Sequence, residues 1–421
     1  MDVQILAFVA LGLLAYGAVS GRLDRSPITP PMAFVALGLG LGPMGLGILD
    51  IDIEHPLFHL LAELTLVIVL FTDASRINVR QLVQEHAIPF RMLAIGLPLT
   101  ILLGIAVAMG LFPSLTVWQA AVIAAVLAPT DAALGQAVVS NARVPLRIRQ
   151  SLNVESGLND GIALPAVVIL LSCLGHHENT MGNDFFWTLF TAKQVVLGPL
   201  VGAAVGYFGG KLVAHASRSG SMNHVFQELS AIALSLGAFS WAELVGGNGF
   251  IAAFIAGLVL GNTTVGLCEC LYEFGEAEGQ LMTLLVFLIF GAVMAPLALA
   301  HFSVEVVLYA LASLTVVRML PVFLSLMGLG LRVDTRVFLG WFGPRGIASI
   351  LFGLLLLEEA DSAQGEMMLL IVVTTVLASV VLHGLSAYPG AVAYADRLED
   401  THAEEEHQMV PAMPLRIRDQ A

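Results

Sequence analysis

Two apolar stretches of this chain carry acidic side chains near their middle. Asp131 lies in the first stretch, and Glu155 and Asp160 lie in the second. A charged side chain at the centre of a bilayer costs about 2.5–3.5 kcal/mol on insertion scales, and such side chains mark ion or proton pathways. If both stretches cross a membrane, the three acids indicate a pathway for ions or protons, because ordinary packing does not need them.

Apolar runs of membrane-spanning length occur along nearly the whole chain. Of the 421 residues, 57% are hydrophobic and only 12% are charged, whereas soluble domains average about 25% charged residues. Runs near the 17–25 residues that cross a bilayer predict an all-α polytopic membrane protein with about thirteen transmembrane helices. The expected spans lie near 3–20, 29–49, 57–74, 89–112, 116–140, 151–174, 190–214, 224–246, 249–263, 272–299, 303–327, 335–357 and 365–388.

The basic residues support this count, because positive charge collects in cytoplasmic loops. Alternate loops hold fifteen of the eighteen Lys and Arg residues, and the intervening loops near 50–56, 175–187 and 358–366 hold none. We therefore expect a multi-pass protein of a prokaryotic plasma membrane, with its N-terminus outside and its C-terminus in the cytoplasm. Asp2 precedes the first span and Arg22 and Arg25 follow it, the reverse of a signal peptide, so this span is expected to remain as a helix.

Other compositional features exclude several classes of function. The formal charge of −14 does not favour nucleic-acid binding. Cys173, Cys268 and Cys270 show no metal-ligand or disulfide spacing. The segment 389–421, which contains Glu404, Glu405 and Glu406, is expected to be a short, solvated cytoplasmic tail. We expect no cofactor.

Two of the predicted spans are interrupted in mid-membrane. Pro129 breaks the fifth span, and Gly343-Pro344-Arg345-Gly346 breaks the twelfth, since proline removes a backbone hydrogen bond. The two spans are seven apart, so they run in opposite directions. Such pairs typify inverted-repeat transporters, whose two broken helices cross near the midplane. Proline kinks used only for packing are the alternative. The glycine-rich run 38–47 has no following Lys, and we interpret it as close helix packing.

The charges at depth do not balance. Asp160 lies about nine residues into its span, roughly 14 Å from the membrane face. Asp131, Glu155 and Asp160 oppose only Arg318 and Arg345, which leaves one negative charge to be neutralised by a proton or a small cation. A carboxylate that can bind either a proton or a cation is the chemical basis of an antiporter. A purely structural ion-pair cluster is the alternative.

Monovalent cations prefer hard oxygen ligands, as other hard cations do. Thr130, Ser156 and Asp160 can supply hydroxyl, carboxylate and freed backbone oxygens, so we place the predicted Na⁺ site there. Asn159 is expected to have a local role, in which it satisfies freed backbone groups or tunes Asp160.

Several motifs match one known family. They are Pro129-Thr130-Asp131, the stretch from Glu155 to Gly161, the stretch from Phe287 to Ala292, Arg318, Gly343-Pro344-Arg345-Gly346, and the stretch from Leu382 to Ser386. With these residues, the chain resembles the monovalent cation:proton antiporter-1 family, the NhaP-like sodium/proton antiporters, over nearly its whole length.

The resemblance implies a thirteen-helix homodimer that exchanges one cation for one proton. Residues 1–388 would form the transmembrane domain, with core helices near 89–174 and 303–388 and dimerisation helices near 1–74 and 224–299. Asp160 would be the carboxylate that binds the cation or the proton, and Thr130 and Ser156 would assist it.

The resemblance also implies roles for the neighbouring residues. Glu155 would pair with a buried arginine beside Asn159; by spacing we place it at Arg318, with Arg345 as the alternative. Asp73 would line the cytoplasmic ion funnel, and Asp131 is included with it among the cation- and proton-binding residues. For His383, a hydrogen-bonded structural role is favoured over that of a proton carrier.

The leading function is electroneutral exchange of Na⁺ or Li⁺ for H⁺, and the protein is not expected to be an enzyme. A K⁺/H⁺ antiporter of the same fold is the close alternative, since selectivity depends on cavity size and field strength. A gated cation channel is less favoured because no filter-like sequence is present. An intramembrane protease is disfavoured because neither the serine nor the aspartyl pattern is convincing. The expected partners are a second copy of the chain, the lipid bilayer, monovalent cations and protons.

Overall fold

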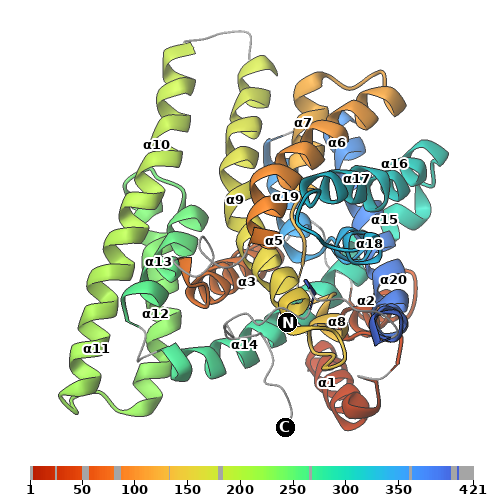
Figure 1. Cartoon of the computed structure of the whole chain (residues 1–421). Helices are drawn as coiled ribbons and strands as arrows, with labels where there is room; N and C mark the ends of the chain where they lie inside the picture. Colours follow the sequence, from red (N-terminus) through yellow and green to blue (C-terminus); the bar gives the residue numbers. More distant parts are fainter. Residues whose placement is uncertain are drawn as a thin grey trace.

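The computed structural model describes residues 3–23, 26–49, 56–79, 87–131, 133–178, 184–264, 268–359, 363–399 and 405–406. Within those ranges the regular structure is helical throughout, and no strand is present. Long and short helices pack together into one bundle (Figure 1).

The helices follow the predicted spans closely. Their bounds are α1 (Val3–Leu23), α2 (Pro30–Leu41), α3 (Pro56–Ser75), α5 (Ala87–Arg91), η1 (Met92–Gly96), α6 (Leu97–Leu111), α7 (Val117–Val126), α8 (Gln136–Val139), α9 (Leu146–Glu178), α10 (Asp184–Ala204), η2 (Val205–Gly209), α11 (Gly210–Arg218), α12 (His224–Leu244), α13 (Gly249–Thr263), α14 (Cys268–Ile289), η3 (Phe290–Met294), α15 (Ala295–Ala300), α16 (Val304–Leu314), α17 (Val316–Ser325), α18 (Val333–Trp341), α19 (Ile347–Glu359) and α20 (Ala363–Glu399). Each predicted span falls on one helix or on a row of consecutive helices.

Length and apolar composition mark eight of the described helices as able to cross a membrane, and α2, α7 and α13 are shorter apolar helices. The all-helical fold with broken spans is therefore confirmed. One boundary differs, because α20 continues to Glu399 instead of ending near 388.

The helices divide into two groups that meet along α9. The scaffold group consists of α3, α10, α12, α13 and α14, which pack on one another. The crossing group consists of α6, α7, α9 and α16 to α20. Figure 1 shows α10 to α14 on one side of the molecule, α6, α7 and α16 to α20 on the other, and α3 and α9 between them.

Glycines join the scaffold helices at backbone distance. A Cβ added to Gly202 of α10 or Gly206 of η2 would lie 2.3 or 2.4 Å from a backbone oxygen of α13, and one added to Gly198 of α10 would lie 2.8 Å from the oxygen of Asn248, the residue before α13. On its other side, α13 packs Gly257 and Gly261 against α3. A Cβ added to either glycine would lie 2.1 or 1.9 Å from a backbone oxygen of α3. Small residues four apart permit this approach in a membrane, where van der Waals packing drives helix association. The three helices α10, α13 and α3 thus form a closely packed slab.

The glycine-rich run 38–47 makes a similar contact elsewhere. A Cβ on Gly38 would lie 2.0 Å from the Leu288 carbonyl oxygen, and one on Gly42 would lie 2.8 Å from that of Ala292. The interpretation as helix packing, and not as a phosphate loop, is confirmed.

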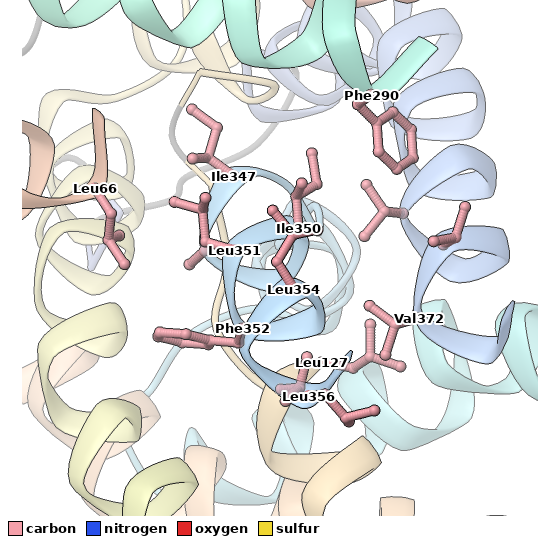
Figure 2. Close-up of a cluster of buried hydrophobic side chains, with 14 of the residues drawn as sticks. Leu66, Leu127, Phe290, Ile347, Ile350, Leu351, Phe352, Leu354, Leu356 and Val372 are labelled. Atoms are coloured by element: carbon pink, nitrogen blue, oxygen red, sulfur yellow. The ribbon is translucent and has the colours of Figure 1, made fainter. Parts of the chain in front are cut away.

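Helix α19 lies at the centre of the crossing group and is apolar on every side. Figure 2 shows the labelled side chains of α19 pointing in several directions, toward Leu66 of α3, Phe290 of η3 and Val372 of α20. Phe352 and Leu356 are fully buried. A helix that is hydrophobic all round belongs in a core, so α19 forms the apolar centre of the crossing group beside the predicted site.

The tail does not behave as predicted at Glu406. Its side chain is 1% exposed; it accepts hydrogen bonds from the Arg332 N–H at 2.9 Å and the Thr335 hydroxyl at 2.8 Å. Glu405 forms an ion pair with Arg147. The expectation of a solvated end is wrong here, because the N-terminus of α18 offers N–H groups and a positive dipole end that a carboxylate satisfies.

Candidate functional site

The two predicted interruptions meet inside the molecule. Helix α7 ends at Val126 and α18 ends at Trp341, and each is followed by an extended segment before the next helix begins. The segments cross, with the Asp131 N–H donating to the Pro344 carbonyl at 2.8 Å. The predicted crossing of two broken helices is present, and it leaves free helix ends in the interior.

Asp131 caps one of these ends. Its Oδ2 accepts from the N–H of Ile347, the first residue of α19, at 2.9 Å, and its Oδ1 accepts from the Ala133 N–H at 2.7 Å. A carboxylate at a helix N-terminus satisfies an orphan donor and complements the dipole. Gly346 makes room, since a Cβ there would lie 1.9 Å from Oδ2. Asp131 was predicted among the cation- and proton-binding residues, and its two carboxylate oxygens here accept two backbone N–H groups.

Arg345 serves the opposite end. Its Nη1 donates to the carbonyls of Ala128 at 2.6 Å and Pro129 at 3.1 Å, just beyond the C-terminus of α7. Its own N–H donates to the Ser379 hydroxyl at 2.6 Å. The side chain is fully buried, and a cation is favourable at a helix C-terminus. The C-terminus of α7 and the N-terminus of α19 therefore each meet a charge of the complementary sign.

Glu155 forms its ion pair with Arg318. Arg318 Nη1 lies 2.9 Å from Glu155 Oε1, and both side chains are 0% exposed. The pairing predicted from spacing is present, and it is made with Arg318 and not with the alternative, Arg345. Gly343 touches the guanidinium, since a Cβ there would lie 2.5 Å from Arg318 Nε. The Gly343-Pro344-Arg345-Gly346 segment thus supports both buried arginines.

Arg318 owes its position to a break that the sequence did not reveal. Helix α16 ends at Leu314 and α17 begins at Val316, and Thr315 between them has φ −106° and ψ −93°. Neither glycine nor proline stands at this point, and Pro321 follows only six residues later. The eleventh span is therefore also divided, directly before the residue that pairs with Glu155.

Thr130 lies at the centre of a polar cluster that it forms with Glu155, Ser156 and Asn159. Its hydroxyl donates to Glu155 Oε2 at 3.0 Å, accepts from Asn159 Nδ2 at 2.5 Å and shares a hydrogen bond with Ser156 Oγ at 3.1 Å. A hydroxyl has one proton and two lone pairs. Since the proton goes to an ionised carboxylate, which can only accept, Ser156 must donate to Thr130. The Thr130 side chain is then fully used, whereas both lone pairs of Ser156 Oγ stay available for a ligand.

Asn159 makes local contacts, but its amide donates to two side chains and not to the freed backbone groups expected from the sequence. Its side chain is fully buried, and Nδ2 donates to Thr130 and, at 3.4 Å, to Glu155 Oε1. It joins the extended segment after α7 to the buried ion pair.

Asp160 lies on the opposite edge of the cluster, at the boundary with the scaffold group. It is partly exposed, one helical turn beyond Ser156. Its neighbours on α9 touch the scaffold. A Cβ on Gly157 would lie 3.7 Å from Asp73 Cβ, and a Cβ on Gly161 would lie 2.3 Å from the Phe254 ring. Asp73 of α3 is thus brought beside α9, a single turn of helix from Asp160.

His383 has a structural position. One ring nitrogen, Nε2, lies 2.9 Å from the Trp341 carbonyl oxygen, and the other, Nδ1, lies 3.1 Å from the Ser379 hydroxyl. The ring is buried, at 1% exposure, and ties the end of α18 to α20. Ser379 also accepts the Arg345 N–H, so His383 acts on the crossing through Ser379.

A sequence profile described as "Sodium/hydrogen exchanger, transmembrane" matches residues 6–392 of the chain. Among curated relatives, the chain is 25% identical over 366 residues to the K(+)/H(+) antiporter NhaP of Alkalimonas amylolytica. The matched region makes up 84% of this chain and 61% of that protein. The chain is 26% identical over 377 residues to the Na(+)/H(+) antiporter ApNhaP of Aphanothece halophytica, covering 86% and 68%. The chain thus spans about three-fifths of the length of its K(+)/H(+) relative.

Among solved structures, the fold is similar to that of the sodium proton antiporter MjNhaP1 from Methanocaldococcus jannaschii at pH 8. The TM-score is 0.75 at 21% sequence identity, covering 94% of this chain and 100% of that one. The two chains therefore share the fold over nearly all of their length.

Proposed function

The chain belongs to the transmembrane sodium/hydrogen exchanger family, and from this premise we propose that it exchanges a monovalent cation for a proton at Asp160. One observation carries the proposal. Of the five charges predicted at depth, Asp131 and Arg345 are matched to helix ends and Glu155 is matched to Arg318. Asp160 lies partly exposed at the boundary between the two helix groups, one helical turn from Ser156. A carboxylate in that position needs a proton or a cation, but not both.

We place the cation between Asp160 and Ser156, on the lone pairs that Ser156 keeps after donating to Thr130. Thr130 is a positioning residue in this proposal, because its hydroxyl is occupied by Glu155, Asn159 and Ser156. Asp73, beside Gly157, would draw cations toward Asp160 from the end of α3 that carries Arg76.

The proposed cycle is electroneutral. One carboxylate carries either one proton or one monovalent cation, so equal charge moves in each direction. Since the two compete, the apparent KM for the cation should rise as the pH falls, with the maximum rate nearly unchanged.

The two helix groups suggest how the site changes sides. The scaffold slab is held by backbone contacts and would remain fixed, as the dimerisation part of a homodimer, while the crossing group carries Asp160 relative to it. This assignment places α10, α12, α13 and α14 on the dimer side together with α3.

Sodium or lithium is the proposed cation, and potassium is the alternative, since relatives named for either ion match the chain at similar identity. Liposomes that contain the purified protein and an internal pH dye test the proposal when Na⁺, Li⁺ and K⁺ gradients are imposed in turn. A cation gradient should change the internal pH, and the cation that does so at the lowest concentration is the substrate. Cation movement without any proton movement would instead identify a channel.

The stoichiometry is tested in the same liposomes with the membrane potential clamped by valinomycin. The exchange rate should not respond to the potential. A clear voltage dependence at zero pH gradient would contradict a one-for-one exchange, even if antiport itself were observed.

A further inference from the structure

We propose that Ser379 and His383 of α20 form an uncharged relay that takes the place of one missing helical hydrogen bond at the crossing, and that this relay positions Arg345 for cation binding. The inference rests on the proposed antiport and adds two positioning residues to it. It also gives a role to the stretch from Leu382 to Ser386, a motif that the exchange site itself does not use.

The missing hydrogen bond lies between the last residue of α18 and the segment that follows it. In an unbroken helix each N–H donates to the carbonyl four residues earlier, so the Arg345 N–H would donate to the Trp341 carbonyl. Here α18 ends at Trp341, and Phe342 has φ −80° and ψ 56°, which lets the Gly343 N–H donate to that carbonyl at 2.8 Å. This geometry is an inverse γ-turn. The Arg345 N–H therefore needs another acceptor inside the protein.

Ser379 and His383 connect the two separated backbone groups. The Arg345 N–H donates to the Ser379 hydroxyl at 2.6 Å, and that hydroxyl lies 3.1 Å from His383 Nδ1. On the other side of the ring, His383 Nε2 lies 2.9 Å from the Trp341 carbonyl oxygen. Ser379 and His383 are four residues apart, so their side chains share one face of α20. Both are buried, at 0% and 1% exposure, and the relay is closed to solvent.

The groups at the two ends fix the position of each proton in the relay. A carbonyl oxygen can only accept, so the ring proton must be on His383 Nε2. The opposite tautomer would place lone pairs against each other at the 2.9 Å contact with Trp341. Nδ1 is then the acceptor, and the Ser379 hydroxyl, which accepts from Arg345, donates its proton to Nδ1.

The relay requires a neutral ring. A proton added to His383 Nδ1 would remove the acceptor that the Ser379 hydroxyl uses. The charged groups that act on the ring are the buried guanidinium groups of Arg345 and Arg318, so a charged imidazole would be a third positive charge in this part of the core. His383 therefore serves as a fixed donor and acceptor, and not as a carrier of transported protons.

A second contact from α20 holds the same end of α18. Trp341 Nε1 donates to the Ser386 hydroxyl at 2.9 Å, and the Trp341 and His383 rings pack with their centroids 4.8 Å apart. The Ser386 hydroxyl donates in turn to the Leu382 carbonyl at 2.7 Å. The end of α18 is thus held on α20 by its backbone and its side chain, and the relay sets the position of Arg345 relative to it.

The position of Arg345 matters because of where its side chain ends. Nη1 donates to the carbonyls of Ala128 and Pro129. The next residue, Thr130, shares a hydrogen bond with Ser156, whose lone pairs are the proposed cation ligands. A shift of Arg345 would move residues 128–130 and, with them, Ser156. Ser379 and His383 thus act on the cation through Arg345.

The transport test separates positioning from a general loss of folded protein. His383→Leu removes both the donor and the acceptor of the ring, and Ser379→Ala removes the hydroxyl. In the liposome assay, each variant should raise the apparent KM for the cation about two- to tenfold, the factor that corresponds to one lost hydrogen bond. The maximum rate per folded protein should stay near that of wild type. A lower maximum rate with an unchanged KM would mean that the two residues only support folding, and would overturn the proposal.

His383→Gln is the matched rescue variant. A glutamine amide is uncharged and offers both an N–H donor and a carbonyl acceptor, as the neutral imidazole does. The variant should keep the wild-type KM and the wild-type dependence of the rate on pH. Glutamine cannot carry protons, so a changed pH profile in His383→Gln would overturn the uncharged relay.

Thr375→Val controls for the loss of a buried hydroxyl on α20. Thr375 lies one turn before Ser379, is fully buried, and donates to the Ile371 carbonyl of its own helix at 2.7 Å. The variant should leave the KM for the cation at the wild-type level. A rise equal to that of Ser379→Ala would show that any loss of a hydroxyl in α20 has this effect, which would contradict a specific relay.

A spectroscopic test is independent of transport. In purified protein labelled with nitrogen-15 histidine, the signals of His383 are those that disappear in His383→Gln. They should show a protonated Nε2 and an unprotonated Nδ1, and they should stay unchanged as the pH is lowered through about 6.5, where an ordinary histidine titrates. A protonated Nδ1, or a ring that titrates there, would refute the relay even where antiport is observed. The expected tautomer in a wild-type protein that shows no exchange would refute the proposed function alone.

Discussion

The crossing and the scaffold slab bury the same kind of segment in different ways. In the slab, helices approach until glycine meets backbone oxygen, and these glycine contacts involve no charged side chain. At the crossing, helix ends are left open and then satisfied by Asp131 and Arg345. Contacts of the first kind are independent of ions, whereas contacts of the second kind depend on charge. A protein that must respond to protonation at one place and stay fixed at another needs both.

The comparison predicts that the largest loss of function comes from the crossing side. Asp160→Asn should abolish exchange, at least tenfold below wild type, because it removes the one exchangeable charge. The thermal melting temperature should stay near that of wild type, since the other acids keep their partners. The liposome assay and a melt on the same preparation check both parts. A well-expressed variant that retains a tenth of wild-type exchange would refute the assignment.

The buried ion pair should give the largest loss of stability. Glu155→Gln or Arg318→Ala leaves one charge buried and uncompensated, which costs about 3–5 kcal/mol. The double variant should lose less than the sum of the two single variants, since the residues are in contact. Thermal melts of the three variants measure this coupling. Additive losses would show that the 2.9 Å pair contributes no coupling energy.

The slab should tolerate charge changes but not added volume. Gly202→Val places a Cβ 2.3 Å from a backbone oxygen of α13, and such overpacking costs about 1–3 kcal/mol. Once folded, the variant should keep the wild-type cation selectivity and pH profile. Gly237→Ala on α12 is the matched control, since nothing lies within 4 Å of its added Cβ. Altered selectivity in Gly202→Val would show that the slab is not a passive support.

The smallest effect should come from the tail contact. Glu406→Gln weakens the hydrogen bonds to the Arg332 N–H and the Thr335 hydroxyl, and we expect a loss of about 1 kcal/mol, the usual worth of such bonds. Exchange at saturating cation should be unchanged. Glu405→Gln, at an exposed position, should cost less. An equal loss of stability in both variants would argue against a specific binding position for the Glu406 side chain.

Much of the fold could be predicted from the sequence, because bilayer thickness fixes the length of an apolar run. The breaks at Pro129 and at residues 343–346 could be predicted as well, since proline and glycine act locally. The break at Thr315 could not, because no local signal marks it. It exists where it directs Arg318 toward Glu155, and that requirement lies in the assembled bundle.

The sequence predicted which residues belong to the candidate site better than it predicted what each residue does there. The partner of Glu155 followed from spacing along the chain. The role of Asp131 did not, because a carboxylate in a span is equally suited to a cation or to a helix end. The contact with the start of α19 becomes visible only in the folded molecule. Glu406 was missed for the same reason, as its partners at Arg332 and Thr335 lie 74 and 71 residues away.

The crossing also constrains how the chain can be made. Asp131 and Ile347 are 216 residues apart, so a ribosome completes the span of α7 long before it reaches α19. During that interval Asp131 lacks the Ile347 N–H and the carbonyls after α7 lack Arg345, and a charge in the bilayer at that stage costs about 2.5–3.5 kcal/mol. The fifth span must therefore wait beside the insertion machinery or near water until the twelfth arrives. Assembly of the crossing is a late event in synthesis, and a nascent chain that stops before residue 344 lacks half of it.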